Sequence, residues 1–362
     1  MTDTMRPAEV FPPGDYLRDE LEARSWSVTD FAQIIARPVQ LVSEILNNRK
    51  EITAQTATEI AAALGTTPEV WLNLQNAYRL HQVQDQPRLT DVQRRARLRG
   101  LVPLAELQRL GWIPKNKNLE VIERAVCAFL HIESLDQQPR WTIAARRSND
   151  AEEHLTPSQR AWIARAAQLA THSKVRPFDR TRLRQLAGEL PRRLQRPERL
   201  SAVQGWLAEL GVAFVTVEHL QGSKIDGAAF YLDNGPPVIA LSLRGNRFDI
   251  VVFTLVHEIA HIVLGHVKGS RVVIDEDAAA EHPDDDIEGQ ANQQASSWIF
   301  PTPIRVQPPI SRATALDIAE AFGVHPSLVV GRLQHDGLLP WSSLRHMVPK
   351  AKDFISYSTA DS

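Results

Sequence analysis

Cysteine is nearly absent from this sequence, and its absence narrows the class of protein. Cys127 is the only cysteine among 362 residues. A lone thiol excludes an intrachain disulfide framework and a metal site built from a cysteine cluster, and it fits a reducing compartment. The formal net charge is only -2 at pH 7, so the chain as a whole has no general affinity for polyanions.

Long hydrophobic runs are also missing. The sequence has no stretch of about 18 consecutive apolar residues, the length that a membrane-spanning helix needs. Its opening residues, Met-Thr-Asp-Thr-Met-Arg, lack the apolar core of a secretory signal. We therefore expect a cytoplasmic protein without a membrane partner, and a chain of this length has room for two or three domains.

A His-Glu-x-x-His motif lies in the mostly apolar stretch 251–261. On a helix, His257 and His261 lie on one face because they are four residues apart, so both imidazoles can bind one metal ion. Glu258 can then act as general base toward a water molecule that the metal activates. Two histidines and a carboxylate suit Zn²⁺ best, so the pattern predicts a zinc hydrolase that acts on a peptide bond.

A catalytic zinc needs a third protein ligand. His266 follows His261 by five residues, a helical rotation of about 500°, so we expect it to point away from the ligand face. Glu288 is the better candidate because it starts a helical pattern that can pack on the histidine helix, and Asn292, one turn later, can orient a ligand. The acidic loop around it leaves other carboxylates open: Asp275, Glu276, Asp277, Glu281, Asp284, Asp285 and Asp286.

A small β-sheet is expected ahead of this motif. Residues 212–217 alternate like a strand, and segments 228–233 and 237–242 flank Asn234-Gly235, a strong hairpin signal. An edge strand of such a sheet can pair with an extended peptide. After Pro301 the pattern predicts further helices over 312–322 and 326–333, with His325 as a core or capping residue.

The other end of the chain reads as five short amphipathic helices. We expect them over 13–24, 27–35, 39–46, 54–64 and 68–78. Ser27 and Thr53 are N-cap candidates, and Gly65 is expected to end the fourth helix. Two short helices joined by a tight turn are typical of the helix-turn-helix.

The third of these helices is the expected DNA reader. Its apolar residues, Val39, Val42, Ile45 and Leu46, should face the core, so the polar ones should face outward and contact base edges: Gln40, Ser43, Glu44 and Asn47. Phosphate contacts are predicted from Arg37, Arg49 and Lys50. The alternative is a helical bundle with a solvated polar face. The head is not basic, so a dimer, or the arginines within 94–99, would have to supply further affinity for phosphate.

The middle of the chain carries no catalytic pattern. Residues 84–87 look like a polar linker, and residues 89–199 are helical by pattern and rich in arginine. This region can couple the two ends or sense a signal. The pattern divides the chain into a head (1–83), a helical middle (84–200), a zinc region (201–303) and a helical C-terminal extension (304–362).

The stretch 211–301 resembles the ImmA/IrrE family of metallopeptidases. The resemblance rests on Phe253-Thr254-Leu255, His257-Glu258, His261, a Glu288-x-x-Ala291-Asn292 helix and Pro301. It implies His257, His261 and Glu288 as zinc ligands and Glu258 as the catalytic residue. It names no group that stabilises the transition state, for which Tyr231, Arg247 and His325 are open candidates.

Residues 13–80 resemble the XRE-type helix-turn-helix of HigA-like antitoxins. The shared residues are Pro13-Gly14, the turn Ala63-Leu64-Gly65-Thr66-Thr67-Pro68, and a Trp71-x-x-Leu74-Gln75-x-x-Tyr78 pattern. Pattern and resemblance together predict a mainly α-helical chain with a smaller α+β, zincin-like domain: a five-helix head, a helical middle, and a small sheet packed on the helix that carries the motif.

Two functions follow. In the first, the chain is a DNA-binding regulator, expected to bind its double-stranded operator as a homodimer, with a zinc endopeptidase that cleaves a partner repressor or the chain itself in a stress response. In the second, it is a HigA-like antitoxin and repressor, with a toxin as partner, and the zinc domain is a sensor or structural unit without proteolysis. An intact Glu258 favours the first, because a structural zinc has no use for a general base.

Overall fold

The structure is a computed structural model of the whole chain, and it describes residues 10–84, 87–137, 142–143, 155–267, 271–276 and 286–359. The chain divides into two compact units, Met1–Ala96 and Arg97–Ser362. The finer division predicted from the sequence, at 83, 200 and 303, stays a prediction.

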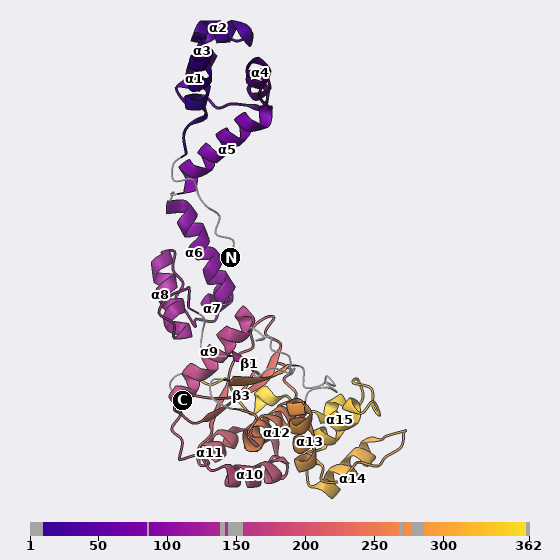
Figure 1. Cartoon of the computed structure of the whole chain (residues 1–362). Coiled ribbons are helices and arrows are strands. Elements are labelled where there is room, and N and C mark those ends of the chain that lie inside the picture. Colours follow the sequence, from indigo (N-terminus) through magenta and orange to yellow (C-terminus); the bar gives the residue numbers. More distant parts are fainter. Residues whose placement is uncertain are drawn as a thin grey trace. The chain divides into compact units, whose positions relative to one another are not determined.

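The first unit is the expected bundle of five helices (Figure 1). They are α1 Pro13–Ala23, α2 Val28–Ile34, α3 Val39–Leu46, α4 Ala54–Leu64 and α5 Pro68–Gln84. Local signals set their ends: Ser27 and Thr53 each form a capping box, and Gly65 closes α4 in the left-handed conformation. Large apolar side chains fill the core between them, among them Leu17, Phe31, Ile45, Ile60 and Trp71.

Three details of this unit differ from the sequence-based expectation. Val39 was expected in the core but is 44% exposed, because it lies in the first turn of α3, at the outer end of the buried stripe. The preference of proline for the first helical position predicts that Pro38 opens the third helix, but Pro38 is the N-cap of α3. The fifth helix does not end at Tyr78 but runs on to Gln84, since no helix-breaking residue intervenes before Pro87. Residues 85–86 of the expected linker lie outside the described residues.

The second unit is built on a five-stranded mixed sheet in the order β1-β5-β3-β4-β2. The strands are β1 Thr142–Ile143, β2 Ala213–Thr216, β3 Ile225–Tyr231, β4 Pro237–Leu241 and β5 Arg271–Glu276. Strands β3 and β4 pair antiparallel around Asn234-Gly235, which confirms the predicted hairpin, while β2 runs parallel to β4. Asp275 and Glu276, expected in an acidic loop, instead lie in β5, because they pair with β3 together with the β-branched residues Val273 and Ile274.

Helices cover both faces of this sheet (Figure 1). Alternate residues of β3 show the two sides: Ala228 and Phe230 pack with α8 and α9, whereas Ala229 packs in the core that contains α10 and α12. The sheet is thus the middle layer of the unit. The helices are α6 Pro87–Leu101, which carries the unit boundary, α7 Leu104–Arg109, α8 Leu119–Leu130, α9 Pro157–Thr171, α10 Arg180–Arg193, α11 Val203–Ala208, α12 Phe248–Leu264, α13 Asp286–Ile299, α14 Arg312–Phe322 and α15 Pro326–His335.

These elements confirm the predicted fold class, a mainly helical chain with a small sheet beside the motif helix. The described residues also contain three short 3₁₀ helices: η1 Pro197–Ala202, η2 Arg345–Met347 and η3 Ala351–Asp353. Within the described ranges, none of the helices is both long and apolar enough to span a bilayer.

Candidate metal centre

Helix α12 is buried along almost its whole length. Most of its residues are apolar on every side, which is typical of a helix inside a large core. It lies between the sheet and a layer that contains α10, α13 and α15. Gly265 ends the helix in the left-handed conformation with φ 79°. The motif residues of this helix are therefore surrounded by protein, as the apolar sequence around them predicted.

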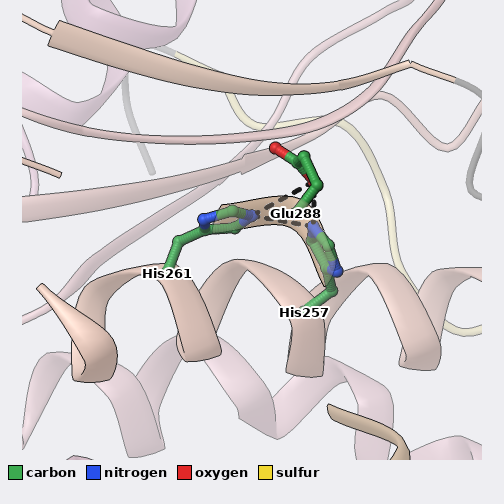
Figure 2. Close-up of side chains that lie close together, drawn as sticks. All are labelled: His257, His261 and Glu288. Carbon is green, nitrogen blue, oxygen red and sulfur yellow. Dashed lines mark hydrogen bonds and ion pairs between the residues drawn. The ribbon is translucent and has the colours of Figure 1, made fainter. Parts of the chain in front are cut away.

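Three side chains converge on one point (Figure 2). His257 and His261 rise from the same face of α12, and Glu288 reaches them from the first turn of α13. The Nε2 atoms of the two histidines are 2.8 Å apart, and Glu288 Oε2 lies 3.1 Å from His257 Nε2 and 3.5 Å from His261 Nε2. These residues are 1%, 0% and 5% exposed. The structure thus brings together the three residues that the sequence proposed as ligands.

The charge states of this cluster suit a cation. Burial lowers the pKa of His261 to about 4, against the opposing effect of Glu288, so this ring is neutral near pH 7. Burial works to raise the pKa of Glu288, but its contacts with His257 and His261 outweigh burial and hold that pKa well below its ordinary value. A neutral imidazole and an ionised carboxylate are the forms that bind metals.

The spacing of the three atoms also fits zinc. With bonds of roughly 2.0–2.1 Å and a tetrahedral arrangement, two ligand atoms on one zinc ion are about 3.3 Å apart. The three separations in the cluster, 2.8, 3.1 and 3.5 Å, lie around that value. His257, His261 and Glu288 can therefore hold one zinc ion with little movement.

Glu258 lies next to the central strand of the sheet. A Cβ atom on Gly227 of β3 would come within 2.6 Å of Glu258 Oε1 and within 2.5 Å of Thr254 Cγ2. The strand can therefore cross this carboxylate only because it has glycine there. Gly227 was not singled out from the sequence, although a glycine inside a strand is a recognised sign of a close backbone approach.

His266 was set aside as a metal ligand in the sequence analysis. It lies beyond the end of α12 and, as expected, is not part of the three-residue cluster. Yet its Nδ1 atom is 3.0 Å from Nδ1 of His261, and its Nε2 atom is 3.3 Å from Oε1 of Gln290. Burial lowers the pKa of His266, so this ring too favours its neutral form. It touches the side of His261 opposite to the cluster.

The remaining predicted site residues occupy other positions. Asn292 is half-buried one turn after Glu288, and no hydrogen bond to the cluster is found for it among the described residues, so its orienting role stays a prediction. Arg247 bonds to Asp249 and to Gln334, and His325 caps α15 as predicted. Four carboxylates that the sequence left open lie outside the described residues: Asp277, Glu281, Asp284 and Asp285.

The predicted DNA contacts gather on and after α3. Gln40 donates to Glu44 at 3.1 Å, and Asn47 donates to the carbonyl of Ser43 at 2.8 Å. Two of the predicted phosphate contacts are engaged within the head: Arg37 forms a two-bond ion pair with Glu59, with distances of 2.9 and 2.7 Å, and Lys50 lies 4.0 Å from Glu44. Arg49 is exposed.

Two separate regions of the chain are similar to known proteins. Residues 213–334 match the family described as Peptidase_M78, IrrE N-terminal-like domain. The HTH-type transcriptional regulator YddM of Escherichia coli K12 is 30% identical over 94 residues, which are 26% of this chain and 97% of that protein. An HTH-type transcriptional regulator of Haemophilus influenzae is 37% identical over 86 residues, 24% of this chain and 78% of its own length.

The chain belongs to the helix-turn-helix transcriptional regulators. Its second unit carries a domain of the IrrE N-terminal-like metallopeptidase family, so both predicted resemblances are confirmed. A solved structure of an addiction module antidote protein of a HigA family from Coxiella burnetii is 41% identical, covers 21% of this chain and 83% of its own, and has a TM-score of 0.20.

Proposed function

We propose that this helix-turn-helix regulator carries a zinc-dependent endopeptidase in its second unit. The observation that carries the proposal is the convergence of His257, His261 and Glu288 on α12 and α13, with Glu258 in the same helix. The matched peptidase family supports the assignment, because residues 213–334 include all four of these residues.

The chemistry is peptide-bond hydrolysis. His257, His261 and Glu288 would hold the zinc ion, which would supply Lewis acidity toward a water molecule and the scissile carbonyl group. Glu258 accepts the proton that the attacking water loses and passes it to the leaving amine. The apolar surroundings of α12 keep bulk water away from the reacting groups. In this proposal an extended peptide would pair with an edge strand of the sheet, and the edge strands are β1 and β2.

The proposed substrate is a peptide bond in a partner helix-turn-helix repressor or in this chain itself, cleaved in a stress response. The resemblance to ImmA/IrrE peptidases motivates this choice, because free-standing members act on repressors. The DNA-binding head shares a chain with the peptidase, so cleavage would change transcription directly.

Glu258→Gln tests the enzymatic part. The amide keeps the size of the carboxylate but accepts no proton, so zinc should stay bound while cleavage falls by roughly 10²-fold or more. The full chain is incubated with zinc and with the products of neighbouring genes, with single-stranded DNA and stressed-cell lysate as inducers, and fragments are read by intact mass. Glu320→Gln, an exposed change on α14, is the control. Identical fragment patterns from the parent and Glu258→Gln would refute proteolysis.

For the DNA-binding part, the proposal is that a dimer of the head binds a roughly palindromic operator. Gln40 and Ser43 on α3 and Asn47 at its C-cap read bases, while Arg49 and Lys50 hold phosphates. Exposed Val39, in the first turn of α3, can contact a thymine methyl group. Footprinting upstream of the chain's own gene tests this part, and an unprotected region there would count against it.

A second candidate function is a DNA-binding antitoxin whose zinc site is structural. The observation in its favour is the burial of the centre, since Glu258 is fully buried and a peptide reaches it only if its cover moves. If this candidate is right, the chain should bind a toxin, its free energy of unfolding should depend on zinc, and no fragments should form under any inducing condition. Co-purification with the product of an adjacent toxin gene would favour it.

A further inference from the structure

The end of α12 folds back beneath the second histidine of the cluster. Gly265, with φ 79°, turns the chain out of the helix, and the backbone N–H of His266 donates to the carbonyl of His261 at 3.0 Å. The two imidazole rings then meet edge to face, with centroids 5.1 Å apart and planes at 67°. The turn therefore places the ring of His266 against the outer side of the ring of His261.

One contact joins the two rings, and a second contact joins His266 to α13. His261 Nδ1 and His266 Nδ1 are 3.0 Å apart, and His266 Nε2 lies 3.3 Å from the side-chain oxygen of Gln290. Gln290 is two residues after Glu288 on the same helix. Helix α13 thus contributes a carboxylate to the cluster and an acceptor to the far end of this chain of contacts.

The direction of these hydrogen bonds can be worked out for neutral rings. The oxygen of Gln290 cannot donate, so Nε2 of His266 carries a hydrogen and Nδ1 of His266 is bare. A bare Nδ1 accepts, so Nδ1 of His261 carries the hydrogen between the two rings. Nε2 of His261 is then bare and faces the cluster. The opposite direction would put a hydrogen on that Nε2 atom and block metal binding.

We infer that His266 and Gln290 form a hydrogen-bonded chain that fixes the tautomer and ring orientation of His261, so that its Nε2 lone pair faces the metal position before a metal binds. This inference rests on the proposed metal site. His266 is here a positioning residue, neither a ligand nor a catalytic group. Metal-binding histidines commonly donate their other nitrogen to a carboxylate, a carbonyl or water, and loss of such a partner costs roughly 10- to 100-fold in metal affinity.

The first test needs no metal. The full chain is labelled with ¹⁵N-histidine, and long-range ¹H–¹⁵N correlations of the zinc-free protein report which ring nitrogen carries the hydrogen. His261 should be protonated at Nδ1 and bare at Nε2, and His266→Leu should convert it to a mixture of tautomers. Gln293→Leu, an exposed change one turn from Gln290 on α13, should leave His261 unchanged. A hydrogen on Nε2 of His261 in the parent protein, or no change in His266→Leu, would overturn the inference.

The second test measures zinc affinity by competition with a chromophoric chelator. His266→Leu and Gln290→Leu should each weaken binding by roughly 10- to 100-fold, whereas His266→Asn, whose side-chain oxygen can accept from His261 Nδ1, should stay within about threefold of the parent. Thermal unfolding of the zinc-free variants checks that the fold is intact. Equal affinity in His266→Leu and the parent, or equal weakening in the Asn and Leu variants, would reject the positioning role.

The two tests separate this inference from the proposed function. If the parent chain binds zinc no more tightly than His257→Ala does, the metal site itself is wrong. If the parent binds zinc through His257 and His266→Leu binds as tightly, the metal site stands and only the chain through His266 and Gln290 is rejected.

Discussion

The helix-turn-helix head and the candidate metal centre place their proposed functional side chains in opposite environments. On α3 the proposed base-reading groups are exposed or half-buried, come from one short segment, and bond to each other, as Gln40 does to Glu44. In the metal centre the groups are buried and come from two helices, α12 and α13.

Because of this difference, we expect a substitution in the head to change function without changing stability, and a substitution in the centre to change both. Contacts between exposed polar groups contribute roughly 0–1 kcal/mol to folding. A buried polar or charged group that loses its partner costs several times more. Substitutions on α3 should therefore change binding alone, whereas substitutions in the centre should change the chemistry and the stability together.

The largest expected effect is on metal binding. In Glu288→Ala the cluster loses a ligand, so zinc affinity should fall by more than the roughly 100-fold that loss of an outer partner costs. Metal analysis after dialysis, together with chelator competition, measures this loss. Full zinc occupancy in Glu288→Ala would move the third ligand to another acidic residue of 275–286.

A tighter comparison uses two glycines of the second unit. In Gly227→Ala the new methyl group meets Glu258 Oε1 and Thr254 Cγ2, so overpacking should destabilise the unit by about 1–3 kcal/mol and lower cleavage. Gly205→Ala, in α11, meets nothing within 4 Å and should leave stability unchanged or raise it by about 0.5–1 kcal/mol. Chemical denaturation of both variants measures the difference, and equal stabilities would mean that β3 does not press on Glu258.

The head should show the reverse behaviour. Changing Gln40 and Ser43 together to Ala should weaken specific DNA binding by about 1–3 kcal/mol while stability stays within roughly 0.5 kcal/mol. Gel-shift titrations with specific and unrelated DNA, alongside thermal unfolding, separate the two quantities. If specific binding survives this double change, α3 is not the reading helix.

The smallest expected effect concerns pH. Burial lowers the pKa of His325, against Glu198 and Asp249, which raise it. The unfolded chain therefore takes up this proton first, and the free energy of unfolding should decrease as pH falls below the ordinary histidine pKa of about 6.5, by at most about 1.4 kcal/mol per pH unit. His325→Asn keeps a capping side chain and should flatten this slope in denaturation curves recorded at several pH values. An unchanged slope would remove His325 as its source.

The sequence predicted best what local chemistry decides. The bounds of α3 and α4 agree with the prediction to the residue, and a cap (Thr53) and a left-handed glycine (Gly65) define α4. The motif helix and its partner Glu288 were also within reach, because a fixed spacing places His257 and His261 on one face.

Long-range contacts explain most of what was missed. Strand β5 exists because it pairs with β3, and a stretch ending in acidic residues gave no sign of that partner. Gly227 matters only because β3 crosses Glu258, and His266 only because Gly265 folds it back onto His261. The exposure of Val39 likewise follows from its place in the first turn of α3, at the outer end of the buried stripe, and not from its apolar character.

The burial of α12 predicts how slowly its backbone amide hydrogens exchange with solvent. Amide hydrogens of a helix packed on all sides exchange with solvent mainly when the whole unit unfolds, unlike those of loops and frayed ends. The amides of His257 and Glu258 should therefore be among the slowest to exchange in the chain. If the proposed site opens to a peptide, we expect the layers that enclose α12 to be displaced while α12 itself stays folded.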